Sequence, residues 1–435
     1  MKKKLITLVL LLTMSVSLLT GCGEPPCIDV NEDPSTFPAT EQQSTSPDPM
    51  AFTTEETANI SGDFNESLME FLNMSSYSNE NFMVSPTSLR AALAMAVAGA
   101  DGETKTELLK AMGFSDEEEM LTWYDSVKDA VARFDESLAW DKQAFEENRE
   151  YLGEDAVEPD GAFELENSIW KNTKASGTLK KEYQQYVQEH FDAASDNVKP
   201  EKITDAVNNW INDKTHGMIP QIAGDLSYAD LVLVNTLYLR SSWLNSFYEW
   251  STKPDHFKTL KGDLVQKDFM QQQNKFRFYE DADGKFVVLP MAGGIRAVFI
   301  LGKVTDLMTK LNTASFEEVD VRLPKFETET SFSQNELIAF CMARGAKLAF
   351  SDKADFSLMS DDMSLGISDI IQKTKIKVEE DGIEAAAATA IVMTETSLEM
   401  DEPEVKEFYA DEPFRYMLLT DDAAPEILFY GQLVE

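Results

Sequence analysis

Histidine and cysteine, which carry much of the acid–base and metal chemistry of proteins, are scarce in this 435-residue chain, with three of each. No HExxH or CxxC pair occurs, and the nearest approach to a GxSxG nucleophile motif, Gly113-Phe114-Ser115-Asp116-Glu117, lacks its second glycine. Adjacent carboxylates such as Asp361-Asp362 lie outside any EF-hand spacing. We therefore predict no bound metal, no cofactor, and neither zinc nor serine-hydrolase chemistry.

Positive charge is also scarce. Lys and Arg number 38 against 77 Asp and Glu, which gives a net charge of -39. A polyanionic surface repels a phosphate backbone at long range, so we do not expect nucleic acid as a partner. The charge says nothing about the fold.

No run of about 18 apolar residues that could span a bilayer follows the first residues of the chain. The start itself has three lysines, an apolar run (Leu5–Leu19) and then Leu19-Thr20-Gly21-Cys22, which resembles a bacterial lipobox. We expect residues 1–21 to be a lipoprotein signal peptide and Cys22 to carry the lipid. A plain secretory signal is the alternative. The mature protein would be secreted and held at the cell envelope by lipid alone, with its domain exposed at the surface.

Two cysteines, Cys27 and Cys341, would remain unmodified, which does not support a disulfide framework. Folding could bring a histidine beside Cys341 and make it a nucleophile. The interpretation that we favour is that Cys341 packs as a small hydrophobic side chain.

Composition divides the rest of the chain. Residues 22–57 are rich in Pro, Ser, Thr, Glu and Gln and poor in large apolar residues, so we predict a flexible stalk. Residues 58–435 are uniformly globular and form one predicted domain. Helical periods occur at residues 89–96 and 103–112, which predicts a mainly helical N-terminal half. Most of the predicted strands come later, which indicates an α+β fold. The predicted strands are 229–240, 286–290, 297–301, 319–323 and 427–430.

One Ala-rich segment has two interpretations. Residues 375–380 alternate as a strand and Asp381-Gly382 breaks them, whereas residues 383–393 contain four consecutive alanines and could be a helix. The alternative is a strand that slides between two others. Its inward face must then be uncharged, as Ile383, Ala385, Ala387, Thr389, Ile391 and Met393 are. Such a strand would be about 36 Å long at about 3.3 Å per residue.

The same segment resembles the hinge of the serpin family. Its residues are Glu380, Asp381, Gly382, Ile383, Glu384, Ala385, Ala386, Ala387, Ala388 and Thr389. Further stretches resemble the family's motifs in order, including Asn81–Ser88, Asn167–Trp170, Val234–Tyr238, Leu323–Phe326, Ala354–Ser357, Phe408–Phe414 and Leu428–Gly431. The resemblance covers residues 58–435 and implies the serpin fold: helices on a large mixed β-sheet, smaller sheets, and an exposed reactive-centre loop near the C-terminus.

The resemblance also implies a mechanism. A target protease attacks the loop and forms an acyl-enzyme, and the freed loop then enters the main sheet and traps the protease, so the protein is not an enzyme. Counting seventeen residues from Glu380 places the reactive bond at Thr396-Ser397. A threonine before the reactive bond suits an elastase-like serine protease. Subtilisin-like and papain-like proteases are the next candidates. Cleavage after Met393, Glu395 or Leu398 is the alternative.

Five further residues match the region where the family's sheet opens: Ser85, Ser88, Asn235, Trp243 and Gln372. The alternative is that they are buried polar groups with no gating role. Two positions depart from the family. Ile383 replaces a small residue and is stiff at χ1, which predicts slow insertion, and Gln372 replaces a histidine, so it does not titrate. A non-inhibitory serpin that acts as a surface binding or structural protein is therefore the second hypothesis, and a lipid-anchored hydrolase the third.

Overall fold

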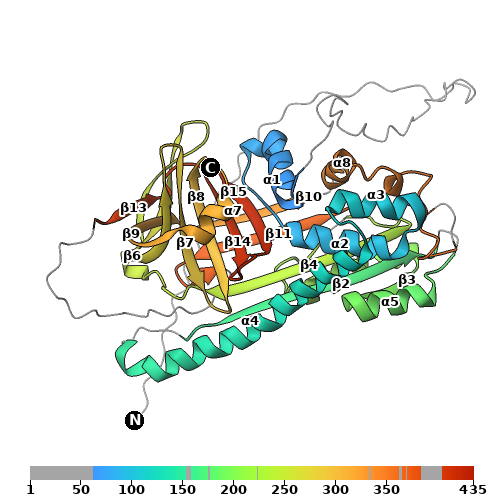
Figure 1. The fold of residues 1–435 in the computed structure, drawn as a ribbon, viewed down its shortest axis with the longest axis horizontal. Coiled ribbons are helices and arrows are strands. Elements are labelled where there is room, and N and C mark those ends of the chain that lie inside the picture. Colours follow the sequence, from blue (N-terminus) through green and yellow to red (C-terminus); the bar gives the residue numbers. More distant parts are fainter. Residues whose placement is uncertain are drawn as a thin grey trace, which may run out of the picture. The chain divides into compact units, whose positions relative to one another are not determined.

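Helices precede most of the strands along the chain, as predicted (Figure 1). The predicted helical periods are confirmed, because residues 89–96 lie in α2 and residues 103–112 lie in α3. Ser85 caps α2, since its hydroxyl accepts a hydrogen bond from the Ser88 amide at 3.1 Å. The helices are α1 (Phe64–Met74), α2 (Pro86–Gly99), α3 (Gly102–Met112), α4 (Glu117–Leu152), α5 (Lys181–Phe191), α6 (Pro200–Lys214), α7 (Leu307–Thr313) and α8 (Glu336–Ala343).

The computed structural model describes part of the chain. The described residues are 62–152, 158–174, 177–222, 224–332, 335–361, 365–368, 370–383 and 404–435. All of them belong to one unit, Pro49–Glu435. The predicted signal peptide, Cys22 and the predicted stalk lie outside the described residues and remain predictions.

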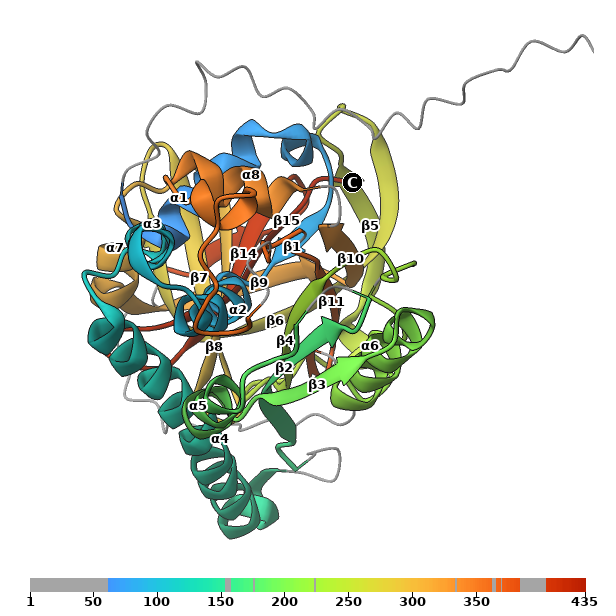
Figure 2. The same ribbon diagram turned by 90° about the vertical axis from the view of Figure 1, so that its right-hand side faces the viewer.

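A six-stranded sheet carries the hinge. Its order is β10 (Phe326–Phe332), β11 (Gln372–Glu379), β12 (Gly382–Ile383), β4 (Leu231–Ser242), β2 (Gly161–Asn172) and β3 (Ala194–Val198). The prediction of a fully buried strand over residues 229–240 is wrong in detail. β4 begins at Leu231, and several of its residues are only half-buried. The reason is that α2 packs on one face of β4, whereas α6 covers only part of the other face (Figure 2).

The second sheet has nine strands and confirms the other predicted strands, which lie within β7, β8, β9 and β15. Its order is β1 (Phe82–Val84), β15 (Ile427–Leu433), β14 (Phe414–Thr420), β8 (Ile295–Gly302), β7 (Gly284–Met291), β6 (Leu264–Glu280), β9 (Ser315–Pro324) and β13 (Lys406–Tyr409), with β5 (Lys253–Lys258) paired to β6. Together with the helices, the two sheets confirm the α+β prediction.

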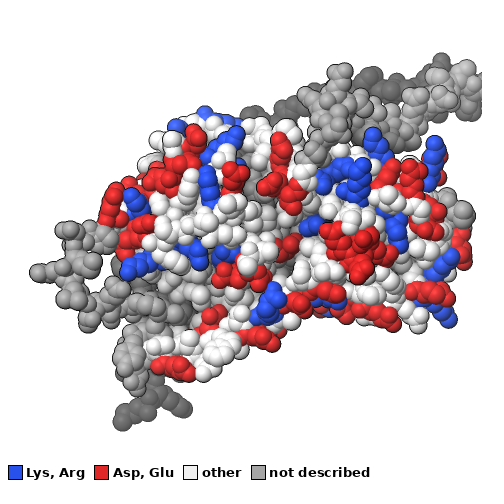
Figure 3. Space-filling view, viewed as in Figure 1, with Lys and Arg blue, Asp and Glu red and all other residues white. Residues whose placement is uncertain are grey.

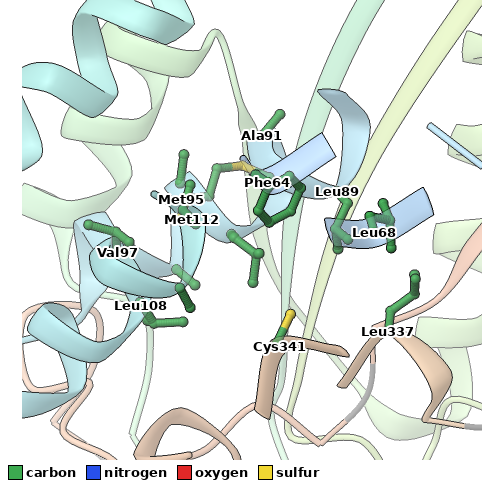
Figure 4. Close-up of a cluster of buried hydrophobic side chains, with 14 of the residues drawn as sticks. Phe64, Leu68, Leu89, Ala91, Met95, Val97, Leu108, Met112, Leu337 and Cys341 are labelled. Atoms are coloured by element: carbon green, nitrogen blue, oxygen red, sulfur yellow. The ribbon is translucent and has the colours of Figure 1, made fainter. Parts of the chain in front are cut away.

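Cys341 lies on α8 in the core between the helices, in the same apolar cluster as Leu337 and Met112 (Figure 4). Its side chain is 1% exposed, and burial raises the pKa of the thiol to about 12. A thiol in this state is not an activated nucleophile. The geometry therefore favours packing over catalysis for Cys341.

Surface charges of both signs are mixed on the face shown in Figure 3, where Lys and Arg alternate with Asp and Glu among the described residues. No described helix combines the length and the apolar character needed to cross a membrane. Within the described ranges, no three or more His, Cys, Asp or Glu side chains gather as metal ligands would.

Candidate functional site

The first residues of the hinge form a short strand inside the six-stranded sheet. In β12, Ile383 pairs with Val378 of β11 and with Ser241 of β4, and both pairings are antiparallel. Gly382 is required here, because a Cβ atom at this position would lie 2.4 Å from the Ser241 carbonyl oxygen. The helical interpretation of the segment that begins at Ile383 is therefore wrong for Ile383 itself.

Ile383 is buried in the space between the two sheets. Its side chain is 2% exposed and belongs to the same apolar cluster as Leu239, Ile376 and Val378. The sequence predicts that a stiff isoleucine slows the insertion of the hinge. In this structure the isoleucine already occupies the position between β4 and β11, so its own insertion is complete.

A buried carboxylate holds the start of the hinge. Glu380 accepts hydrogen bonds from Lys325 Nζ and Thr252 Oγ1, both at 2.7 Å, and its carbonyl oxygen accepts one from the Phe247 amide at 3.1 Å. Burial alone would raise the pKa of Glu380, but the bonds from Lys325 and Thr252 outweigh burial and hold that pKa below its usual range. Glu380 is therefore an ionised anchor for the hinge.

Trp243 holds the neighbouring backbone. Its indole nitrogen donates a hydrogen bond to the Glu379 carbonyl oxygen at 2.9 Å, and its amide donates to the Asp381 carbonyl oxygen at 3.1 Å. The side chain is 1% exposed and packs near Phe247 and Phe299. Trp243 thus directly follows the last residue of β4 and lies beside the hinge.

The other four predicted residues of the opening region form one polar cluster. Ser85 and Gln372 exchange hydrogen bonds of 2.9 and 3.0 Å between the Ser85 backbone and the Gln372 amide group. The Ser88 hydroxyl donates to the Asn235 carbonyl oxygen at 3.5 Å, and Asn235 donates through its side-chain amide to Asn167 at 2.8 Å. The buried Oδ1 atom of Asn235 accepts no hydrogen bond from the described residues.

A narrow cavity, which we call the strand gap, continues from Ile383 between β4 and β11. It encloses about 30 Å³ and is lined by the polar cluster, by Thr374 and by Ile376. Residues of α6 and of the segment that follows it, Ile211, Met218 and Ile222 among them, cover its outer side. A second cavity, lined by apolar residues, extends the same line toward Leu231 and Ile371.

The remaining predicted site residues are not described. Glu384 to Thr389 and the predicted reactive bond, Thr396-Ser397, fall in residues 384–403, outside the described residues. The chain is described again from Glu404, and β13 then pairs in parallel with β9.

Sequence reasoning missed the partners of Glu380. Lys325 lies in the motif Leu323–Phe326, but no local pattern marks either Lys325 or Thr252 as a partner of Glu380. The signal was the acidic pair Glu379-Glu380 at the end of a strand with apolar neighbours, because a carboxylate buried there requires a cation and hydroxyl donors. Lys325 Nζ also lies 3.8 Å from the Glu379 carboxylate, so the same ammonium group lies near both carboxylates.

The chain is similar to known proteins over the part that holds both sheets and the hinge. A family model described as "Serpin (serine protease inhibitor)" matches residues 59–435. Serpin-Z1B of Triticum aestivum is 30% identical over 385 residues, which cover 81% of this chain and 90% of that protein. The leukocyte elastase inhibitor of Sus scrofa is 29% identical over 383 residues, which cover 81% and 92%. The crystal structure of Serpin48 from the insect Tenebrio molitor has a TM-score of 0.62 at 27% identity, and the match covers 84% and 94%.

Proposed function

Because the chain belongs to the serpin family of serine protease inhibitors, we propose that it traps a target protease by inserting its loop between β4 and β11. The protease nucleophile attacks the carbonyl carbon of Thr396, the peptide bond to Ser397 breaks, and the acyl-enzyme remains attached to the freed loop. The loop enters the strand gap before water hydrolyses the ester. The observation that carries the proposal is β12, which is already paired with both flanking strands at the mouth of this gap.

The register of β12 supports this course for the next residues. If the two antiparallel pairings continue, Thr389 falls opposite Asn235 and Gln372. A threonine hydroxyl there suits the Oδ1 atom of Asn235, which accepts no hydrogen bond from the described residues. Ala385 and Ala387 would face the inner side, where a charged side chain would be buried without a partner.

β4 and β11 are each paired with β12 at the mouth of the strand gap, and they are not paired with each other in the described part of the sheet. On the outer side, Lys214 at the end of α6 lies 2.8 Å from Glu166 of β2, and His216 in the segment that follows lies 3.0 Å from Glu164 of β2. The Lys214–Glu166 pair is half-buried, whereas the His216–Glu164 contact is exposed and contributes little to stability.

A threonine before the reactive bond suits a protease with a shallow specificity pocket, so the proposed target is an elastase-like or subtilisin-like serine protease. A papain-like cysteine protease is the next candidate. The similarity to a leukocyte elastase inhibitor supports the first of these. The proposed location is the outer face of a bacterial cell envelope, with lipid on Cys22 as the anchor. The support for it is the lipobox-like sequence at residues 19–22.

The non-inhibitory alternative depended on Ile383 as an obstacle to insertion. Since Ile383 is already buried between β4 and β11, the structure offers that alternative no separate support. The choice between the two functions therefore rests on a direct measurement.

The test mixes the full chain with elastase-like and subtilisin-like proteases and resolves the products on a denaturing gel. A band at the summed mass supports trapping, and cleavage near Thr396 with the protease still active would refute it. Ala387→Glu should abolish the band, because this carboxylate would have to enter the inner face of the sheet. Ala386→Glu is the matched control: it adds the same charge on the outer face, beside Lys375 in the extended register. Equal loss in both variants would contradict insertion in this register.

A further inference from the structure

A pair of stacked aromatic rings, exposed Trp250 and half-buried Tyr248, lies beside the hinge and takes no part in the proposed insertion. Trp250 is 77% exposed, the largest such fraction among the large hydrophobic side chains described. Its ring is stacked on that of Tyr248, with centroids 5.3 Å apart and planes 21° apart. We propose that this aromatic pair is a docking surface for the target protease, separate from the reactive loop. This inference rests on the proposed function.

The aromatic pair is fixed to the start of the loop. It belongs to the segment Phe247–Thr252, and both ends of this segment bond to Glu380: the Phe247 amide donates to its carbonyl oxygen at 3.1 Å, and Thr252 Oγ1 donates to its carboxylate at 2.7 Å. Both ends of the segment therefore contact Glu380, and Trp250 lies between them with its ring exposed to solvent. Only Asp381 and Gly382 separate Glu380 from Ile383, which is the last described residue before Glu404.

The aromatic pair is also connected to the strand where the chain returns. Ser251 Oγ donates to the Gln271 carbonyl oxygen at 2.8 Å. Gln271 pairs with Arg322 of β9, and Arg322 pairs with Tyr409 of β13. The guanidinium of Arg322 also lies 4.3 Å from the centre of the Tyr409 ring. The two strands that flank residues 384–403 in the chain, β12 and β13, are thus both connected to the segment that carries the aromatic pair.

The chemistry of the surface fits a protein partner with apolar and basic groups beside its active-site cleft. Stacked Trp and Tyr rings provide a large contact area with little side-chain entropy to lose, which is typical of the residues that dominate protein interfaces. Glu249, next to Trp250 in the chain, is exposed and can pair with a basic group of the partner.

The test measures two quantities for the full chain: the association rate constant for the covalent complex, and reversible binding to the same protease with its nucleophile replaced by alanine. Trp250→Ala should lower the association rate constant about tenfold or more and weaken reversible binding by a similar factor, as expected for a hot-spot residue. The stoichiometry of inhibition should stay unchanged, because loop insertion does not use Trp250. Tyr228→Ala is the control, since Tyr228 is 57% exposed but precedes β4, at the end opposite the hinge.

Equal rates and equal reversible binding for Trp250→Ala and the unmodified chain would overturn the inference. A change in stoichiometry instead of rate would also overturn it, because the aromatic pair would then be supporting the hinge. If the unmodified chain binds the inactive protease but never forms the covalent complex, the proposed trapping fails while the docking surface stands. If it does not bind the inactive protease at all, the docking surface fails as well.

Discussion

Gln372 and Ser85 bind each other twice: the Ser85 amide donates to Gln372 Oε1 at 2.9 Å, and Gln372 Nε2 donates to the Ser85 carbonyl oxygen at 3.0 Å. The pair joins β11 to the residue that caps α2, at the inner wall of the strand gap. A glutamine makes this connection at any pH, whereas a histidine at the same position would titrate near neutrality. The Ser85–Gln372 pair therefore connects β11 to the start of α2 independently of pH.

The first prediction concerns this link. Gln372→Ala leaves both backbone groups of Ser85 without their side-chain partner in a buried site, which should lower the free energy of unfolding by about 1–3 kcal/mol. Gln273→Ala is the control, because Gln273 is exposed and its side chain bonds to half-buried Glu318 at 3.1 Å, so we expect a change within about 0.5 kcal/mol. Denaturant titrations of the two variants provide the comparison, and equal effects would contradict the assigned role.

The second prediction concerns the anchor of the hinge. Lys325 Nζ lies 2.7 Å from the Glu380 carboxylate, whose side chain is 8% exposed. Lys325→Met should lower the free energy of unfolding at pH 7 by about 1–3 kcal/mol, because it leaves a buried carboxylate with only Thr252 as a side-chain donor. Lys377→Met is the control. Lys377 pairs with Glu379 at the same 2.7 Å but is 45% exposed, so the loss should be below about 1 kcal/mol.

The stability difference between the unmodified chain and Lys325→Met should also depend on pH, in a direction set by the pKa of Glu380. The folded-state pKa of Glu380 is held below its unfolded value of about 4.3, so the stabilisation is fully present above pH 4.3 and disappears as the pH falls through the folded pKa. The difference between the unmodified chain and Lys325→Met should therefore stay constant from pH 7 to about pH 5 and shrink below about pH 4. A difference that persists undiminished at pH 3 would show that Lys325 stabilises the fold by packing instead.

The elements with a strong period were predictable from the sequence. α2 and α3 follow from apolar residues at helical spacing, and β7, β8, β9 and β15 follow from short β-branched and aromatic runs. The positions of Ser85, Ser88, Asn235, Trp243 and Gln372 in one region followed from the family resemblance, since those residues are spread over nearly 300 positions and no local pattern connects them.

The state of the hinge was not predictable. Alternation shows which side of residues 383–393 faces inward, but it does not show how far the strand has entered the sheet, because that depends on the difference between two large packing energies. Ile383 is an example. Its size predicts an obstacle to insertion of the hinge, yet in the structure it fills an apolar site beside Ile376 and Val378. Thr252, 128 residues from Glu380, could be recognised as its partner only in the folded chain.

The last prediction tests the register of insertion through charge. If the pairings of β12 continue by one residue, Glu384 falls opposite Arg240 of β4 and Lys377 of β11, so the only charged residue of the segment 383–393 would meet two cations on the outer face. Glu384→Lys replaces these attractions by repulsion, which slows insertion relative to hydrolysis of the acyl-enzyme. We expect a higher stoichiometry of inhibition and more cleaved, non-inhibitory product on a denaturing gel, with Glu384→Gln intermediate. Adding Lys377→Glu to Glu384→Lys should restore part of the covalent complex. An unchanged stoichiometry in Glu384→Lys, or no rescue in the double variant, would mean that the loop enters in another register.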